Sequence, residues 1–220
     1  MNDIASPQTF DVAIPIDEGN LPGFLDRPVN ATGLVLFAHG SGSSRFSSRN
    51  RAVAEVLNRS RLATLLFDLL TPDEHERDMH SRALRFDIPL LTERLVRAID
   101  WAHSDPRVSD LPLGLFGAST GAAAALRAAV ERPDLVRAVV SRGGRPDLAD
   151  EALSQVRVPT LLIVGGLDVQ VLELNRDAAA RMTMAPELQV VPGATHLFEE
   201  PGTLGAAASL ATDWFRQHLG

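Results

Sequence analysis

The stretch Gly114-Leu115-Phe116-Gly117-Ala118-Ser119-Thr120-Gly121 decides the fold of this chain, because an apolar run turns sharply there into a helix-prone segment. The run predicts a buried strand ending at Phe116, and the alanine-rich segment Ala122–Glu131 predicts a helix that Pro133 ends. Residues two before and two after a serine in such a turn must lack bulk, and both are glycine here. The turn exposes the serine hydroxyl beside the unpaired N–H groups of a helix N-terminus. The pattern G-x-S-x-G therefore predicts Ser119 as a nucleophile, with an ordinary helix-capping turn as the plainer alternative.

Apolar runs alternate with amphipathic segments along most of the chain, which predicts a parallel sheet with helices on both faces. Residues from Ile88 to Ala102 repeat at helical spacing, and Leu204–His218 predicts a final amphipathic helix. Near the start, Phe10–Ile16 alternates and a turn at Gly19–Gly23 leads into Phe24–Arg27, so we expect a hairpin at the sheet edge. The other predicted strands are Leu34–Ala38, Ala63–Phe67, Leu113–Phe116, Val136–Val140, Thr160–Val164 and Leu188–Val191.

The composition narrows the chemistry. A length of 220 residues, 45% of them hydrophobic, suits one core, so we expect a single domain over residues 1–220. A formal net charge of −7 argues against a nucleic-acid partner, which would need a basic face. The chain has no Cys, which excludes disulfides, thiolate metal sites and a thiol nucleophile. All 21 basic residues are Arg and Tyr is absent, so lysine-dependent catalysis and the Tyr–Lys pair of short-chain dehydrogenases are excluded.

The N-terminal segment Met1–Phe10 lacks the basic-then-apolar pattern of a signal peptide, and no window is apolar enough to span a membrane. We therefore expect a cytoplasmic protein with no membrane partner. We expect no cofactor and no metal. The sequence leaves both a monomer and a homodimer possible.

Two further strand ends supply an acid and a base. Asp168 follows the predicted strand Thr160–Val164, and His196 follows the predicted strand Leu188–Val191. Open α/β sheets gather their sites at the carboxyl ends of strands. Asp168 would orient the imidazole of His196, which would take the proton from Ser119. Taken singly, Asp168 could be a helix N-cap and His196 a surface histidine. Together with Ser119, however, they are three such residues at strand ends, which predicts a Ser–His–Asp triad.

Other motifs compete with this interpretation. Asp147, after the preceding strand, is the alternative acid. Three residues separate Glu76 from His80 where zinc proteases have two, so a metalloprotease is rejected and only a weak carboxylate–His metal site is left open. The run Gly40-Ser41-Gly42 begins a dinucleotide fingerprint, but Arg45 occupies the position of its third glycine.

The chain resembles the α/β-hydrolase superfamily over nearly its whole length, and more closely its dienelactone-hydrolase-like branch of small members without a lid. The stretches that carry this resemblance are Phe37–Ser44, Gly114–Gly121, Gly165–Asp168 and Gly193–Phe198. The resemblance implies an α/β-hydrolase fold: a mostly parallel sheet of about eight strands, helices on both faces and no large cap. It implies the chain order Ser, Asp, His for the triad, and an oxyanion hole made by the N–H groups of Ser41 and Thr120. His39, in the same loop as Ser41, would brace that loop by hydrogen bonding.

Dienelactone hydrolases proper use a Cys nucleophile, whereas this chain has Ser119. We therefore expect hydrolysis of ordinary carboxylic esters through an acyl-enzyme, with lactone or thioester hydrolysis as the alternative. A non-catalytic hydrolase-fold scaffold is the alternative from another class.

The short connection from Val140 to Thr160 leaves room for only one short helix around Asp147–Gln155, so we expect an open site for a small-molecule ester. The loop Leu70–Ala83 would partly cover its entrance. Arginines near strand ends, Arg145 among them, could hold a substrate carboxylate. The candidate substrate contacts are Arg45, Arg142, Val169, Leu197 and Phe198.

Overall fold

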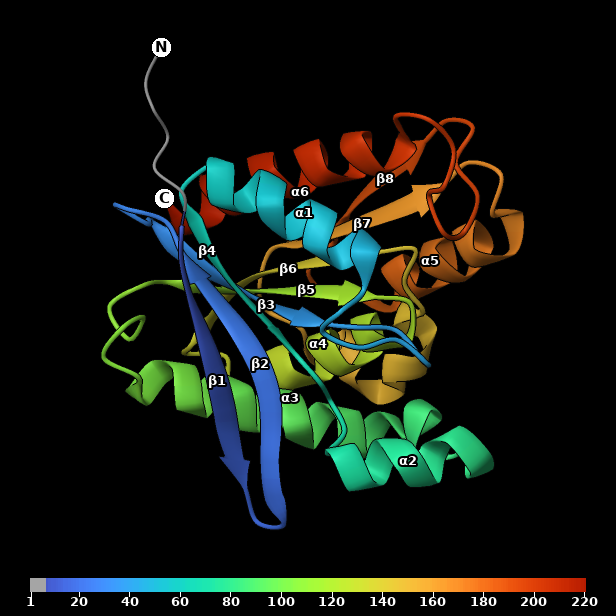
Figure 1. The fold of residues 1–220 in the computed structure, drawn as a ribbon. Helices are drawn as coiled ribbons and strands as arrows, with labels where there is room; N and C mark the ends of the chain where they lie inside the picture. Colours follow the sequence, from blue (N-terminus) through green and yellow to red (C-terminus); the bar gives the residue numbers. More distant parts are fainter. Residues whose placement is uncertain (1–6) are drawn as a thin grey trace.

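The computed structural model describes residues 7–220 and centres on one eight-stranded sheet, in the order β1-β2-β4-β3-β5-β6-β7-β8 (Figure 1). The strands are β1 (Gln8–Ile16), β2 (Gly19–Arg27), β3 (Gly33–Ala38), β4 (Leu62–Phe67), β5 (Leu113–Ala118), β6 (Val136–Arg142), β7 (Thr160–Gly165) and β8 (Glu187–Val191). Strands β3 to β8 pair in parallel, whereas β2 pairs antiparallel with both β1 and β4. The predicted mostly parallel sheet of about eight strands, with a hairpin at its edge, is confirmed.

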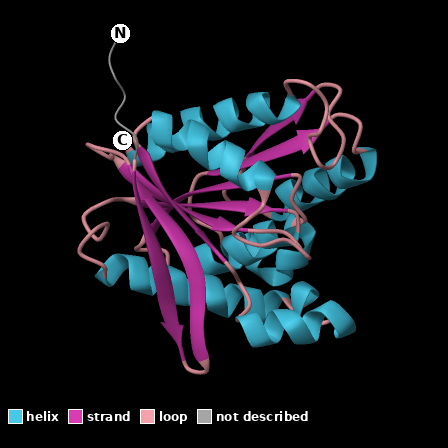
Figure 2. Ribbon diagram, viewed as in Figure 1, coloured by secondary structure: helices cyan, strands magenta, loops and turns pink. Residues whose placement is uncertain are grey.

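Helices cover both faces of this sheet (Figure 2). The α-helices are α1 (Ser48–Arg59), α2 (Pro72–Ser81), α3 (Ile88–Ser104), α4 (Thr120–Glu131), α5 (Val169–Arg181) and α6 (Thr203–Leu219), with short 3-10 helices η1 (Leu84–Phe86) and η2 (Pro146–Gln155). Helices α1 and α6 share one core cluster with Phe37 and Phe116 from the sheet. Helices α3 and α4 share the other with Leu36 and Leu115. Neighbouring residues of β3 and β5 thus face opposite layers, which explains why both strands are apolar throughout and entirely buried.

The turn of the edge hairpin lies earlier than its glycines suggest. Strands β1 and β2 pair from Ile16 with Gly19 onward, so the segment Gly19–Gly23, expected as a turn, belongs to β2. A side-chain Cβ at Gly23 would lie 2.9 Å from the Cβ of Phe67. That glycine therefore permits close packing of β2 on β4 and does not form a turn.

The segment Leu70–Ala83, expected as a loop, contains helix α2, so that expectation was wrong. The helix begins with a capping box: the N–H of Glu74 donates to the Thr71 hydroxyl, and the N–H of Thr71 donates to the Glu74 carboxylate. Pro72 occupies the first turn, where its missing N–H costs nothing. Arg94 of α3 forms an ion pair with Glu74 at 2.9 Å, which ties the polar helix to the body of the molecule.

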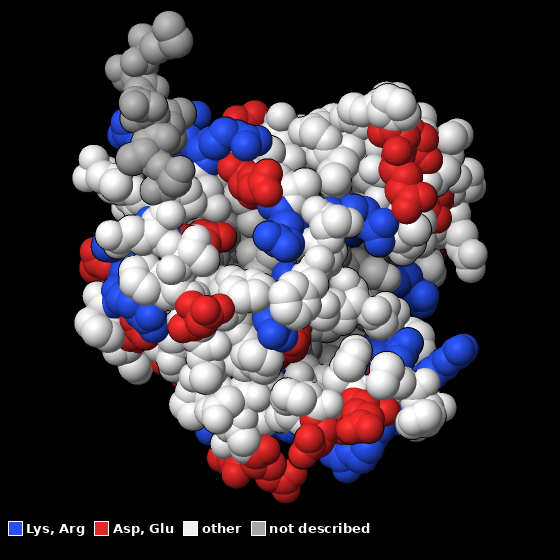
Figure 3. All heavy atoms as spheres, viewed as in Figure 1, with Lys and Arg blue, Asp and Glu red and all other residues white. Residues whose placement is uncertain are grey.

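The connection from β6 to β7 holds only η2, so within residues 7–220 no large cap covers the sheet. None of the helices within residues 7–220 combines the length and apolar character that crossing a membrane requires. Acidic and basic side chains are mixed over the face shown in Figure 3. The predicted absence of a signal peptide concerns Met1–Phe10, of which residues 1–6 lie outside the described residues.

Candidate active site

Ser119 occupies a strained turn between β5 and α4. Its backbone angles are φ 51° and ψ −123°, a region that L-residues adopt only when the surrounding structure enforces it. A Cβ at Gly117 would lie 2.4 Å from the Cα of Ala122, and a Cβ at Gly121 would lie 2.1 Å from the carbonyl oxygen of Ala38. Both glycines of the motif are therefore required by close backbone packing, and the turn holds Ser119 at the carboxyl end of the sheet.

The imidazole of His196 hydrogen-bonds the carboxylate of Asp168, with 2.6 Å between Nδ1 and Oδ2. A carboxylate only accepts, so Nδ1 donates this hydrogen bond, and in the neutral imidazole the lone pair is then on Nε2. Asp168 stands at the N-cap position of α5, yet its side chain makes no capping bond and turns to His196 instead. The alternative acid, Asp147, accepts two hydrogen bonds from the Arg145 guanidinium, at 2.8 and 2.7 Å.

Ser119 and His196 line one cavity of about 240 Å³. Ser41, Arg142 and Leu197, three more of the predicted site residues, line it as well. The first turn of α1 also reaches this cavity, a contribution that the sequence analysis missed. The residues it supplies, together with the helix cap, are Ser47, Arg49 and Asn50.

The loop after β3 packs directly on the nucleophile turn. A Cβ at Gly40 would lie 3.0 Å from the Cβ of Ser119, so only glycine lets the loop approach so closely. His39 braces this loop as predicted: its Nδ1 donates to the carbonyl of Gly40 at 3.0 Å, and its Nε2 accepts from the N–H of Leu69 at 3.1 Å. Burial lowers the pKa of His39, which keeps the ring neutral.

Each of the two predicted oxyanion donors follows, in sequence, one residue of this contact between Gly40 and Ser119. Thr120 is the first residue of α4, so its backbone N–H has no acceptor within the helix. Ser41 follows Gly40 and lines the same cavity as Ser119. This placement suits an oxyanion hole, and the assignment stays a prediction.

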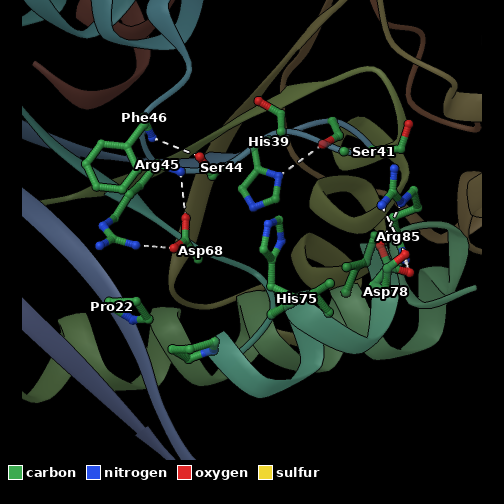
Figure 4. Close-up of a pocket in the computed structure, with 16 residues that line it drawn as sticks. Pro22, His39, Ser41, Ser44, Arg45, Phe46, Asp68, His75, Asp78 and Arg85 are labelled. Carbon is green, nitrogen blue, oxygen red and sulfur yellow. Dashed lines mark hydrogen bonds and ion pairs between the residues drawn. The ribbon is translucent and has the colours of Figure 1, made fainter. Parts of the chain in front are cut away.

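A second cavity, of about 460 Å³, is also lined by the loop that follows β3 (Figure 4). Gly40, Ser41 and Ser43 line both cavities. Figure 4 shows His39 and His75 pointing toward each other across it, with Arg85 held by Asp78 at one side.

Arg45, predicted as a substrate contact, lines this second cavity and not that of Ser119. Its guanidinium forms an ion pair with Asp68 and lies 4.2 Å from the ring centroid of Phe46. Two other predicted contacts lie outside both cavities. Val169 is 64% exposed at the start of α5, and Phe198 is buried in the core that α1 and α6 share.

Comparison with known proteins places the chain in a family. The model of the dienelactone hydrolase family matches residues 53–219. The crystal structure of a dienelactone hydrolase from Anabaena variabilis is 56% identical with a TM-score of 0.96, over 98% of this chain and 100% of that one. Est1E from Butyrivibrio proteoclasticus has the same fold at 17% identity, with a TM-score of 0.78 over 94% of this chain and 98% of that one.

Two curated proteins of Mycobacterium tuberculosis, from strains CDC 1551 and H37Rv, are 56% identical over 98% of this chain. Both are named "Putative phosphoribosyl transferase". The chain spans about half the length, 48%, of these relatives. The family match covers most of the chain, and the Anabaena structure shares its α/β-hydrolase fold from end to end. The chain belongs to the dienelactone hydrolase family.

Proposed function

We propose that this chain hydrolyses carboxylic esters through an acyl-enzyme on Ser119. One observation carries the proposal: Ser119, held in a strained turn, shares a cavity with His196, and Nδ1 of His196 is hydrogen-bonded to the carboxylate of Asp168. This arrangement supplies a nucleophile, a base and an orienting acid. Membership in a hydrolase family supports the same chemistry.

In the proposed acylation step, the Ser119 hydroxyl oxygen attacks the ester carbonyl carbon and its proton passes to Nε2 of His196. Asp168 stabilises the resulting imidazolium through the 2.6 Å bond to Nδ1. The backbone N–H groups of Ser41 and Thr120 stabilise the negative charge on the carbonyl oxygen. The intermediate collapses when the carbon–oxygen bond to the alcohol breaks, and the alcohol leaves with the proton from His196.

Deacylation repeats these steps with water as the nucleophile. His196 takes a proton from water, the hydroxide oxygen attacks the acyl carbon, and Ser119 leaves with the proton returned by His196. The carboxylic acid departs and the enzyme returns to its starting state. No cofactor is needed for either half of this cycle.

The size of the cavity favours small esters. About 240 Å³ around Ser119 accommodates a short acyl group, and Leu197 offers it an apolar contact. Thioesters would react by the same route. Lactone hydrolysis is the second candidate, favoured by the 56% identity to a protein named dienelactone hydrolase, and it differs only in that the leaving alcohol stays attached to the acyl group.

The name of the mycobacterial relatives does not conflict with this proposal. We propose that the transferase activity in their name belongs to the half of their length that this chain does not match. The Anabaena dienelactone hydrolase supports this division, because this chain covers all of it.

Hydrolysis of p-nitrophenyl acetate and p-nitrophenyl butyrate tests the proposal. Wild-type protein should hydrolyse both esters, and S119A or H196A should each lower kcat by about 10⁶-fold, as in other serine hydrolases. S44A is the matched control, because Ser44 does not line the cavity of Ser119 and its hydroxyl accepts a 3.3 Å bond from the N–H of Phe46. Losses near tenfold in S119A would contradict the role of Ser119, and a folded but inactive wild type would favour a non-catalytic scaffold.

A further inference from the structure

The guanidinium of Arg142, the last residue of β6, has no acidic partner among the described residues, 7–220. Only 8% of the residue is exposed, and its Nη1 atom is buried with no hydrogen-bond partner among residues 7–220. Its one side-chain hydrogen bond there is a long one, 3.4 Å from Nη2 to the amide oxygen of Asn50. The rings of Phe116 and Phe198 lie 5.9 Å from the guanidinium carbon, which is near the limit of a cation–π contact.

Arg94 shows how this chain stabilises a buried arginine that has a structural role. It is 7% exposed, almost the same as Arg142, and it donates to the Glu74 carboxylate at 2.9 Å. A buried cation without a counter-charge is strongly unfavourable, so a purely structural arginine at position 142 would be expected to have such a partner. The missing negative charge points to a ligand.

The surroundings of Arg142 favour an anion as that ligand. Arg142 lines the same cavity as Ser119 and His196, and the twelve residues that line the cavity include no Asp or Glu. A second guanidinium, that of Arg49, reaches the cavity from the first turn of the twelve-residue helix α1, and it is paired with the carboxylate of Glu199 at 3.1 Å. The N-terminus of that helix carries partial positive charge, and its cap residue, Ser47, also lines the cavity.

We propose that Arg142 binds an oxyanion carried by the ester substrate, a carboxylate or a phosphate, beside the carbonyl that Ser119 attacks. This inference rests on the proposed esterase function and names the substrate class of that site. The cavity of about 240 Å³ places the anion only a few bonds from the scissile carbonyl, so the substrates are short esters with a charged terminus. Burial, followed by the charge of Arg49, lowers the pKa of Arg142 to about 10, so the guanidinium is still protonated at neutral pH.

Matched esters test the inference on the unmodified protein. We compare p-nitrophenyl butyrate with mono-p-nitrophenyl succinate and with the p-nitrophenyl ester of 3-phosphonopropanoic acid, three short acyl groups with different termini. At least one anionic ester should have a kcat/KM about 10- to 100-fold above that of the butyrate, the gain expected of a charge-assisted hydrogen bond. Preference for succinate identifies a carboxylate site, and preference for the phosphonate identifies a phosphate site. Equal or lower kcat/KM for both anionic esters would overturn the proposal.

Substitution assigns the preference to Arg142. In R142M the ratio of anionic to neutral kcat/KM should fall toward one, mainly through KM, and R142K should keep part of it. R145M is the matched control, because Arg145 lies three residues away but is paired with Asp147, and it should keep the wild-type ratio. An unchanged ratio in folded R142M or R142K would assign the preference elsewhere and overturn the proposal.

Direct binding separates this inference from the esterase function. Titration calorimetry of S119A with inorganic phosphate and with succinate needs no turnover. One of the two anions should bind to S119A, and the affinity should fall at least tenfold in S119A/R142M. Anion binding without esterase activity in the wild type would support the anion site and contradict the esterase function. Esterase activity in the wild type without anion binding to S119A would support the esterase function and contradict the anion site.

Discussion

At the scale of single residues, the geometry of the candidate site depends on where side chains are absent. Gly121 lies where β3 passes beneath the start of α4, and a Cβ there would be 2.1 Å from the carbonyl oxygen of Ala38 and 2.6 Å from that of His39. Both obstacles are backbone atoms, which cannot rotate away as a side chain could. The position of Ser119 relative to His196 therefore requires that residue 121 have no Cβ atom.

The substitution G121A should displace the nucleophile turn. We expect a loss of kcat/KM of at least about 100-fold, because displacements near 1 Å have that effect in active sites. We also expect a lower Tm. G205A in α6 is the matched control, since a Cβ there meets nothing within 4 Å, and it should slightly raise Tm through helix propensity. Ester hydrolysis at the wild-type rate by G121A would contradict this description of the turn.

Two aspartates at the ends of neighbouring strands offer a second test. Asp168 is hydrogen-bonded to the imidazole of His196, whereas Asp147 is paired with the guanidinium of Arg145. D168N should lower kcat by about 10⁴-fold, because an amide in place of the carboxylate favours the wrong imidazole tautomer. D147N should stay near wild type in the same assay. The opposite ranking would assign the acid to Asp147.

At the scale of elements, helix α2 depends on interactions other than an apolar face. Glu74 and Asp78 are its buried residues, and each is paired with an arginine from a following segment, Arg94 and Arg85 respectively. Burial alone would raise the pKa of Asp78, but the hydrogen bonds and charge of Arg85, together with the N–H of Leu84, outweigh it and hold that pKa below its ordinary value. The polar character that made this segment resemble a loop is what attaches it to the protein.

Loss of the ion pair between α2 and α3 should be costly. R94M leaves the buried Glu74 carboxylate without its counter-charge, and the free energy of unfolding should fall by about 3 kcal/mol. R97M is the matched control, because Arg97 lies three residues further along the same helix. It breaks exposed ion pairs with Asp17 and Glu93 and should change the free energy of unfolding by at most about 0.5 kcal/mol. Equal effects in urea denaturation would show that α2 is not held by this pair.

The elements differ in how well the sequence predicts them. Continuous apolar runs such as Leu113–Phe116 predicted buried strands correctly, because a strand covered on both faces must be apolar throughout. The sequence analysis did not predict helix α2, because its buried side chains are charged and their partners lie up to 20 positions away. Its capping signature of Thr71, Pro72 and Glu74 was the available signal.

At the scale of the whole molecule, the sheet brings residues far apart in the sequence to one edge. Ser119, Asp168 and His196 could be nominated in advance because each follows a predicted strand. Asn50 could not be predicted, because its contact with Arg142 spans 92 positions and depends on where the fold places the start of α1. The position of Phe198 also depends on the fold. Its proximity to His196 in the sequence predicted a substrate contact, whereas the fold buries its ring in the core.

Acid should destabilise the whole molecule. Glu74, Asp78, Asp100 and Asp105 all have pKa values held below their ordinary values in the folded state. The unfolded state then binds more protons, so their contribution to stability is present above the ordinary values of 4.5 for Glu and 3.8 for Asp and is lost as pH falls below them. The lowered pKa of His39 acts in the same direction from 6.5 downward.

We therefore expect the free energy of unfolding, measured in urea, to fall steadily between about pH 6.5 and pH 3. D78N should flatten the lower part of this curve while reducing stability at pH 7. A curve that is level below pH 5 would contradict the assignment of these pKa shifts.

The most direct test of the central claim is covalent labelling of Ser119. The protein is treated with a fluorophosphonate probe, digested, and the modified peptide is identified by mass spectrometry. Reaction of the serine oxygen at phosphorus expels fluoride and requires the base and the oxyanion donors proposed here. We predict a single adduct on Ser119 that forms in wild type and is absent from S119A and strongly slowed in H196A. Absence of labelling in folded wild type, or labelling that persists in S119A, would contradict the account.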